Sequence, residues 1–283
     1  MAAWYRQYAR DLPWRAHDFG AWGILVSEVM LQQTPVSRVI DPLASWLSRW
    51  PTPADLASVP AGEAVRAWGR LGYPRRALRL HACAIAIVGR HDGVVPHDLD
   101  ALLALPGIGE YTARAVAVFA YGQRHPVVDT NVRRVIARAV HGNGQPAPPS
   151  IRRDLADMEE LLPGDAEAAQ VVSAAVMELG AIVCTARAPR CEACPIANSC
   201  AWRAAGYPEY HGPARPVQAA FEGSDRQVRG LILAQLRASE IPVRMADISS
   251  LWPDAEQRER ALDGLLADCL VTGDQTKGYQ LPE

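Results

Sequence analysis

Four of the six cysteines in this 283-residue chain are gathered in one short segment. They follow the spacing C-x6-C-x2-C-x5-C, as Cys184, Cys191, Cys194 and Cys200. Four thiolates so close in sequence can surround one metal centre while ordering little chain. Structural zinc sites commonly use two C-x2-C pairs, whereas a single pair with uneven flanking spacings is more typical of a cubane iron–sulfur cluster. The spacing therefore favours an iron–sulfur cluster and leaves zinc as the alternative.

Two arginines, Arg187 and Arg190, lie in the loop between the first two of these cysteines. They can balance the negative charge of a cluster and its thiolates, or they can contact the phosphates of a nucleic acid. Cys83 and Cys269 stand apart from the other four, so we expect them to be ordinary packing residues.

A second candidate site is the turn Leu105-Pro106-Gly107-Ile108-Gly109, which separates two helical patterns. Glycines such as Gly107 and Gly109 let the backbone approach a phosphate closely. The N-terminus of the following helix supplies free N–H donors and the positive end of the helix dipole. Turns of this kind between helices are common, so the signal becomes specific only together with the cysteines.

These residues must be positioned by helices, because apolar residues recur at spacings of three and four along most of the chain. One helix is predicted after Asp18, through Trp22 to Met30. Ser150 is a good N-cap for another. Further helices are predicted over residues 36–49, 61–70, 75–90, 110–121, 130–141, 150–162 and 165–182.

The chain changes character near Tyr210–Pro213, after the cysteines. Three helical patterns follow, and the end of the chain suggests a short hairpin. Three helices with a terminal hairpin resemble a small winged-helix module. The predicted helices span residues 226–238, 244–250 and 254–269, and the predicted strands lie at 271–274 and 278–281.

Charge does not decide whether the partner is a nucleic acid. The net charge is −2 overall, +5 over residues 60–140 and −3 over residues 213–283. A basic face is therefore compatible with the middle of the chain, and so is an ordinary solvated surface. No apolar run has the length of a membrane span, and the first residues lack a signal-peptide pattern. We expect a cytoplasmic protein without a membrane partner.

Together, the L-P-G-I-G turn, the stretch Val128–Val135 and the cysteine spacing resemble the iron–sulfur branch of the helix-hairpin-helix DNA glycosylases. Leu12-Pro13-Trp14-Arg15 and Ser27–Thr34 (S-E-V-M-L-Q-Q-T) are similar to the adenine DNA glycosylase (MutY) family within that branch. Endonuclease III, another member, lacks an acidic residue at the position of Glu28 and has a catalytic lysine at that of Tyr111. The resemblance covers about residues 4–205.

The resemblance implies a catalytic pair of carboxylates. Glu28 would protonate adenine at N7 and help deliver water, and burial among apolar neighbours would raise its pKa as this role requires. Asp129 would face the cation at the sugar C1′, while also capping a helix. Asn131 would support Asp129 by a hydrogen bond. Tyr111 would line the pocket near Asp129, and because it cannot form a Schiff base, strand cleavage is not expected.

The same resemblance implies double-stranded DNA with a mispaired adenine as the partner and a [4Fe-4S] cluster as the cofactor. A monomer is our default expectation. Flipping a base out of the stack requires residues that fill the gap. Gln32 and Gln33 match a loop inserted into the stack, and Tyr73 matches an aromatic residue beside the opposing base. Trp14 and Arg15 match residues near the flipped adenine. The structural alternatives are a helix end, a turn tyrosine and a core tryptophan.

Two departures from the family pattern concern recognition. Ala174 stands where the family commonly has Gln or Glu to help read adenine. Most members also carry a larger, Nudix-like C-terminal domain that reads 8-oxoguanine, whereas the 71 residues after Gly212 are too few for one.

The predicted fold is an all-α, two-lobed glycosylase body with a winged-helix-like C-terminal domain. We assign residues 1–18 plus 130–212 to the iron–sulfur domain, 19–129 to a six-helix domain with the helix-hairpin-helix, and 213–283 to the C-terminal domain. The predicted activity is removal of adenine opposite 8-oxoguanine or guanine. A thymine–guanine mismatch glycosylase of the same fold and a non-catalytic DNA-binding iron–sulfur regulator are the alternatives.

Overall fold

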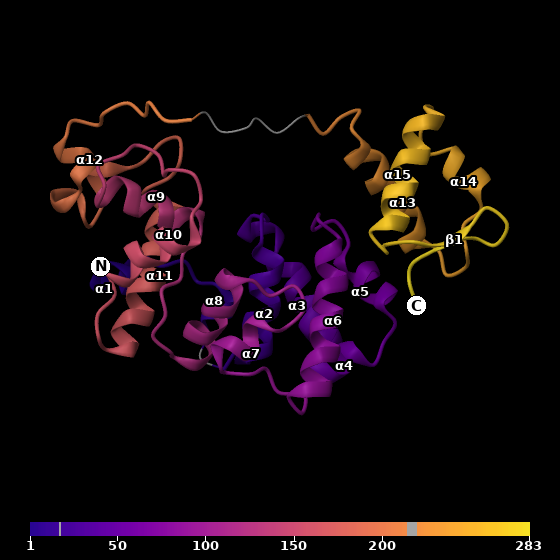
Figure 1. The fold of residues 1–283 in the computed structure, drawn as a ribbon, viewed down its shortest axis with the longest axis horizontal. Coiled ribbons are helices and arrows are strands. Elements are labelled where there is room, and N and C mark those ends of the chain that lie inside the picture. Colours follow the sequence, from indigo (N-terminus) through magenta and orange to yellow (C-terminus); the bar gives the residue numbers. More distant parts are fainter. Residues whose placement is uncertain (17, 214–219) are drawn as a thin grey trace. The chain divides into compact units, whose positions relative to one another are not determined.

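The computed structural model describes residues 1–16, 18–213 and 220–283, and they form an almost entirely helical protein (Figure 1). The predicted all-α body is confirmed. The chain divides into two compact units. Unit 1 comprises Met1–Ile24, His97–Leu103 and Ile108–Arg215, and unit 2 comprises Leu25–Pro96, Ala104–Gly107 and Pro216–Glu283. No described helix has both the length and the apolar composition needed to span a membrane.

The long helices of unit 1 begin at capping side chains. Asp129, Ser150 and Asp165 each accept a hydrogen bond from the backbone N–H three residues further on, so each satisfies one donor that the helix leaves unpaired. The helices of this unit are α1 (Ala2–Tyr8), α7 (Leu99–Leu103), α8 (Glu110–Tyr121), α9 (Thr130–Ala139), α10 (Ile151–Glu159), α11 (Ala166–Ile182) and α12 (Ala201–Ala204).

The main core of unit 1 lies where α9, α10 and α11 meet. Val132 and Leu179 are fully buried there, and Met158 joins them from α10. Cys184 and Cys194 pack against the same cluster of residues. The loop that follows α11 is therefore fastened to this core.

Unit 2 is built around three buried tryptophans. Trp46 packs edge-on against Trp50 and Trp68, with ring centroids 4.7 and 5.6 Å apart. Such aromatic pairs contribute about 0.5–1.5 kcal/mol beyond the area they bury. The helices here are the part of α2 (Gly20–Leu31) from Leu25 onward, α3 (Ile40–Arg49), α4 (Pro53–Ala57), α5 (Ala61–Trp68) and α6 (Arg75–Arg90).

The L-P-G-I-G turn joins two helices, α7 and α8, and so is the turn between helices that the sequence predicts, although the bounds of α7 were not predicted. Gly107 has φ +77, and a Cβ there would lie 2.7 Å from the Cβ of Arg79, so only glycine fits. Gly109 caps α8 from an extended conformation and has open space beside it. The N-terminus of α8, the positive end of its helix dipole, therefore follows directly after this turn.

The C-terminal residues 225–283, hereafter the C-terminal module, contain the predicted three helices and hairpin. Strands β1 and β2 pair antiparallel, and Val243 and Tyr279 exchange backbone hydrogen bonds of 2.8 Å beside them. The elements are α13 (Asp225–Ala238), α14 (Met245–Ser249), α15 (Ala255–Ala267), β1 (Thr272–Asp274) and β2 (Gly278–Gln280).

Two findings differ from the sequence expectations. The short helices α1, α4 and α7 have no predicted counterpart, because five to seven residues carry too little periodicity. Cys269 is exposed at the turn after α15, so the prediction that it packs in a core was wrong. The compact units group α8 with the cysteine segment and the C-terminal module with α3–α6. The domain boundaries assigned from the sequence stay a prediction.

Candidate functional site

Glu28 lies on α2 and is only 5% exposed. Its helix neighbours Leu25, Val26, Val29 and Met30 are buried as well, because this part of α2 is apolar on every side. Glu28 is therefore buried, as the resemblance implies, and does not lie on an exposed helix surface. A carboxyl group in such surroundings is suited to carrying a proton, because burial disfavours its charged form.

Asp129 is the N-cap of α9, and both of its carboxylate oxygens are engaged. Oδ1 accepts from the backbone N–H of Val132 at 2.7 Å, and Oδ2 accepts from Nδ2 of Asn131 at 2.7 Å. Desolvation raises the pKa of Asp129 above its usual value, although these hydrogen bonds and the charge of Arg134 act in the opposite direction. Asp129 can therefore cap α9 and also serve as a carboxylate of the candidate site.

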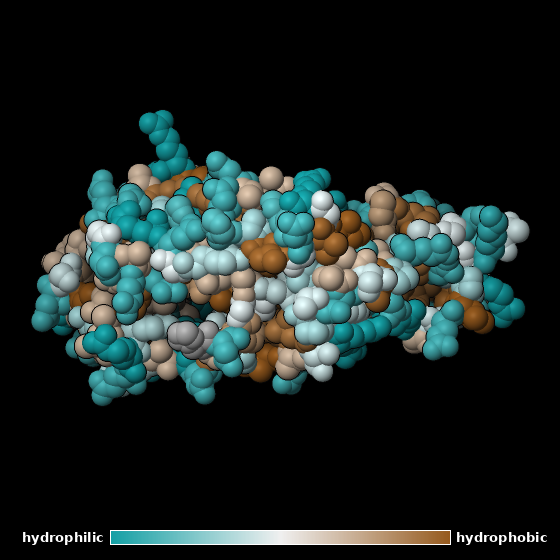
Figure 2. All heavy atoms as spheres, turned by 90° about the horizontal axis from the view of Figure 1, so that it is seen from below, coloured by the Kyte–Doolittle hydropathy of each residue, from teal (hydrophilic) through white to brown (hydrophobic). Residues whose placement is uncertain are grey.

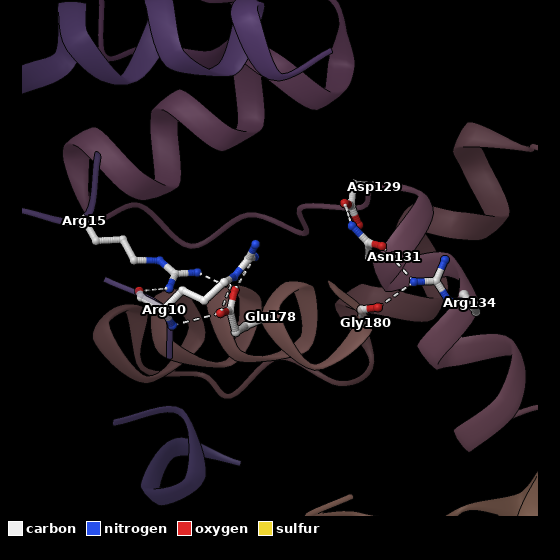
Figure 3. A network of polar contacts seen from close by, with 7 residues as sticks. All are labelled: Arg10, Arg15, Asp129, Asn131, Arg134, Glu178 and Gly180. Carbon is white, nitrogen blue, oxygen red and sulfur yellow. Dashed lines mark hydrogen bonds and ion pairs between the residues drawn. The ribbon is translucent and has the colours of Figure 1, made fainter. Parts of the chain in front are cut away.

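A chain of hydrogen bonds runs from Asp129 through Asn131 and Arg134 to Gly180 (Figure 3), and a further bond of Arg134 extends it to Cys184. The guanidinium of Arg134 donates to Oδ1 of Asn131 at 2.7 Å and to the carbonyls of Gly180 and Cys184 at 2.6 and 2.7 Å. A Cβ at Gly180 would lie 2.7 Å from the Cβ of Asn131, so only glycine lets α11 approach α9 this closely.

A second network in unit 1 was not predicted from the sequence (Figure 3). Glu178, whose side chain is 1% exposed, accepts from the backbone N–H and the guanidinium of Arg10 and from Nη2 of Arg15, at 2.8–2.9 Å. These cations hold the pKa of Glu178 at about 2, against the opposing effect of burial. Arg15 is also fixed by the carbonyl of Arg10 at 2.7 Å. The segment containing the L-P-W-R motif is thus tied to α11.

Trp14 and Tyr111 also belong to unit 1. Trp14, in the 3-10 turn Pro13–Arg15, is only partly buried, which argues against a simple core role. Tyr111 lies in the first turn of α8 and packs against a core that includes Ala115 and Val127. Its predicted hydrogen bond near Asp129 stays a prediction.

In unit 2, the turns that carry Gln32, Gln33 and Tyr73 are joined by one buried arginine. Arg76 donates to the carbonyls of Val29 and Met30 in the last turn of α2, to that of Gln32 just after it, and to Thr34 Oγ1 at 2.9 Å. It also donates to the carbonyls of Leu71 and Gly72, beside Tyr73. Sequence reasoning missed Arg76, although an arginine directly after a turn in an apolar helix is a usable signal.

The two turns present strained or exposed residues. Gln33 and Tyr73 have φ values of +55 and +46, which residues other than glycine rarely adopt. Tyr73 is 50% exposed. The guanidinium of Arg76 lies 5.5 Å from its ring and 5.1 Å from that of Trp68. Backbone strain combined with exposure of a large aromatic is typical of functional turns.

The four clustered cysteines line one cavity of unit 1, as their spacing predicts. Arg138 extends from α9 to this cavity and donates to Cys184 Sγ at 3.3 Å and to the carbonyls of Thr185 and Ala186. Its guanidinium also lies over the ring of Trp202. Four cysteines lining one cavity, with the buried cation of Arg138 beside them, have the chemistry that suits an anionic iron–sulfur cluster. Among the described residues, no three such ligands are placed to hold a single metal ion. Arg187 and Arg190 are both exposed on the loop between the first two cysteines.

The chain matches two family models. Residues 26–160 match the HhH-GPD superfamily of base excision DNA repair proteins. Residues 184–200 match the iron–sulfur binding domain of endonuclease III, a segment that begins and ends at cluster cysteines. The cofactor of this chain is a [4Fe-4S] cluster.

Relatives and solved structures agree with these models. The adenine DNA glycosylase of Mycobacterium tuberculosis is 56% identical over 283 residues, which cover 100% of this chain and 92% of that protein. The thymine/uracil-DNA glycosylase of Pyrobaculum aerophilum is 37% identical over 69% of this chain and 86% of its own length. A solved thermostable thymine-DNA glycosylase has a TM-score of 0.65 at 27% identity, over 72% of this chain and 93% of that one. The chain therefore belongs to the adenine DNA glycosylase family.

Proposed function

We propose that this protein hydrolyses the N-glycosidic bond of adenine mispaired with 8-oxoguanine or guanine in double-stranded DNA. The observation that carries the proposal is that one chain holds a buried acid, Glu28, and a carboxylate fixed by hydrogen bonds, Asp129, with Tyr111 in place of a catalytic lysine. Two carboxylates in different environments suit glycoside hydrolysis.

Glu28 would act first. Its buried carboxylic acid donates a proton to N7 of the flipped adenine, which makes the base a better leaving group. The bond between C1′ and N9 then breaks, and its electron pair leaves with the base. Glu28, now a carboxylate, accepts a proton from the water that adds to C1′.

Asp129 would stabilise the oxocarbenium-like sugar. Its charge is held in place by the Val132 N–H and by Asn131, so little reorganisation is needed when the cation forms. Tyr111 has no amine to form a Schiff base, and the product is therefore an abasic site in an intact strand.

The exposed turns would hold the DNA open. Gln32 and Gln33 fill the space of the flipped adenine, and Tyr73 stacks beside the opposing base. Trp14 and Arg15 line the base pocket, with Arg15 oriented by Glu178. The N-terminus of α8 after Gly107 and Gly109 receives a phosphate.

The cluster would brace the DNA-facing loop. Cys184, Cys191, Cys194 and Cys200 would hold it, and it supplies a rigid, charged anchor for the segment between them. Arg187 and Arg190 on that segment would contact phosphates. We further propose that the protein acts as a monomer and that the domains assigned from the sequence are its functional parts.

Removal of thymine opposite guanine is the second candidate, because the Pyrobaculum relative carries a thymine/uracil-DNA glycosylase name at 37% identity. Single-turnover reactions would compare duplexes with A opposite 8-oxoguanine, A opposite G, T opposite G and A opposite T, with abasic sites revealed by alkali. We expect adenine release from the first two duplexes alone, and no strand cleavage before alkali. The Glu28→Gln variant should release no adenine from any duplex. Release of thymine alone would favour the second candidate. Absence of any release from the cluster-loaded protein would favour a non-catalytic regulator.

A further inference from the structure

The C-terminal module has no assigned role, and its chemistry does not favour direct contact with DNA. Residues 213–283 carry a net charge of −3. The described arginines Arg229, Arg244 and Arg260 pair with carboxylates, and Arg237 and Arg258 donate to carbonyls. DNA affinity depends largely on cations that are free to neutralise phosphates. Hydrophilic residues also predominate on the face shown in Figure 2, with hydrophobic ones in small separate groups.

The module is instead bound to α5 of its own unit by hydrogen bonds from arginine side chains to backbone carbonyls, in both directions. Arg66 of α5 donates to the carbonyls of Arg237 and Ser239, at the end of α13. Arg237 in return donates to the carbonyl of Val65 at 3.0 Å, and burial lowers the pKa of its guanidinium. Each arginine thus satisfies carbonyls at the C-terminal end of the other helix, which such ends leave unpaired.

A close contact at Gly62 adds to this attachment. The N–H of Gly62 donates to the carbonyl of Pro282 at 2.7 Å. A Cβ at Gly62 would lie 2.4 Å from that oxygen and 2.9 Å from the Cβ of Leu281. Glycine is therefore required for the last residues of the chain to lie on α5.

The module also holds the first residue of α6. Asp268 Oδ1 lies 3.1 Å from Nη1 of Arg75, and Asp268 pairs with Arg229 through its other oxygen. Both charges are unfavourable within their own helices. Arg75 stands at the positive end of the α6 dipole, and Asp268 caps the negative end of α15. Each charge is unfavourable at the end of its own helix and is compensated by the other charge. The ion pair therefore serves the tertiary contact and not either helix alone.

The turn that carries Tyr73 is the segment between these two attachments, since it joins α5 to α6. We infer that the C-terminal module positions the Tyr73 turn through Asp268 and Arg75, and that it acts on DNA only through this turn. The inference rests on the proposed role of Tyr73 beside the opposing base. Asp268 and Arg75 are positioning residues, because they act through Tyr73 and not on the reacting atoms.

The test uses the full-length, cluster-loaded protein and measures two quantities. The Kd for a duplex with A opposite 8-oxoguanine is measured in variants that also carry Glu28→Gln, so that adenine is not released from the DNA. The single-turnover rate at saturating DNA is measured in proteins that keep Glu28. Asp268→Asn and Arg75→Gln are each expected to raise Kd about three- to fivefold, the upper range for a partly exposed ion pair, and to change the saturated rate less than twofold. The double variant is expected to match either single one, and Asp268→Glu to restore binding.

Three controls separate positioning from general loss of structure. Arg260→Gln removes another ion pair of the module that does not reach α5 or α6, and it should leave Kd unchanged. Gly62→Ala should raise Kd at least as much as Asp268→Asn. Its match is Gly89→Ala, at a helical glycine with open space around it, which should leave Kd unchanged.

Lys277, at the exposed tip of the hairpin, tests direct contact with DNA. Lys277→Ala should change neither Kd nor its salt dependence. If it weakens binding and lowers the slope of log Kd against log salt by about one, the module touches phosphates itself and the inference is overturned. An unchanged Kd in Asp268→Asn also overturns it. If the protein with Glu28 unchanged releases adenine from neither mispair, the proposed function is refuted. This result differs from the Lys277→Ala and Asp268→Asn outcomes, which test only the inference.

Discussion

Nδ2 of Asn131 donates to Oδ2 of Asp129 at 2.7 Å, while Oδ1 of the same amide accepts from Arg134. The amide is oriented by Arg134, so its N–H groups face the carboxylate. Asn131 is therefore fixed as a donor to the residue that we propose stabilises the sugar cation.

Replacement of Asn131 by alanine should shift the pH dependence of adenine release. The hydrogen bond from Asn131 lowers the pKa of Asp129, whereas burial raises it. Removing the bond raises that pKa further, so the acidic limb of the single-turnover rate should move to higher pH. At neutral pH we expect a loss of about 10- to 100-fold, the range for one electrostatic contact to a developing charge. An acidic limb at the wild-type position would show that Asn131 does not tune Asp129.

The paired arginines on Glu178 should contribute strongly to stability. Because the folded-state pKa of Glu178 is depressed to about 2, its contribution is present above the unfolded pKa and is lost as pH falls from there toward 2. Glu178→Gln should lower the free energy of unfolding by about 2–3 kcal/mol at pH 7. The difference from wild type should be smaller at pH 4 than at pH 7, as measured by urea denaturation. Glu159→Gln, which removes an exposed partner of Arg124, is the matched control and should show less than about 1 kcal/mol.

Much of this architecture follows from local sequence. Periodicity predicts α6, α8 and α11 to within a few residues, because each carries an apolar stripe long enough to define its period. The four cysteines are recognisable because their ligands come from one short segment. Glu178 and Arg10 could not be paired in advance, since 168 residues separate them and only the packing of α11 brings them together. The ionic contact of Asp268 with Arg75 depends on tertiary structure in the same way.

Arg76 should couple the two exposed turns of unit 2. The residue is 6% exposed, and burial lowers its pKa to about 10, so it remains charged at neutral pH. Arg76→Lys keeps the charge but cannot reach both sets of carbonyls, because its donors radiate from a single nitrogen. We expect it to cost about 2–4 kcal/mol in the free energy of unfolding.

The same substitution should weaken binding to mispaired DNA by at least tenfold, because both turns lose their common donor. Arg79→Lys, on the next turn of α6, serves as the control for a change of arginine to lysine. Equal Kd values for wild type and Arg76→Lys would mean that the turns keep their geometry without Arg76.

Arg138 should retain the iron–sulfur cluster. It is 4% exposed, and its donors reach Cys184 Sγ and the two carbonyls that follow, so it both compensates the charge of the cluster and fixes the loop. Arg138→Met keeps most of the volume and removes these donors. The variant should be purified with less iron per chain, and its visible absorbance should decay faster under a chelator, by about 10-fold, as for other residues that support metal ligands.

Arg203→Met, at a partly exposed arginine that also lines the cysteine cavity, provides the comparison. Its iron content should match wild type, because its ion pair with the exposed Glu192 spans 4.0 Å and is accessible to water. If both variants lose the cluster equally, positive charge near the cavity matters and the specific contacts of Arg138 do not. If only Arg138→Met loses it, the hydrogen bonds to the cysteine segment are what hold the cluster in place.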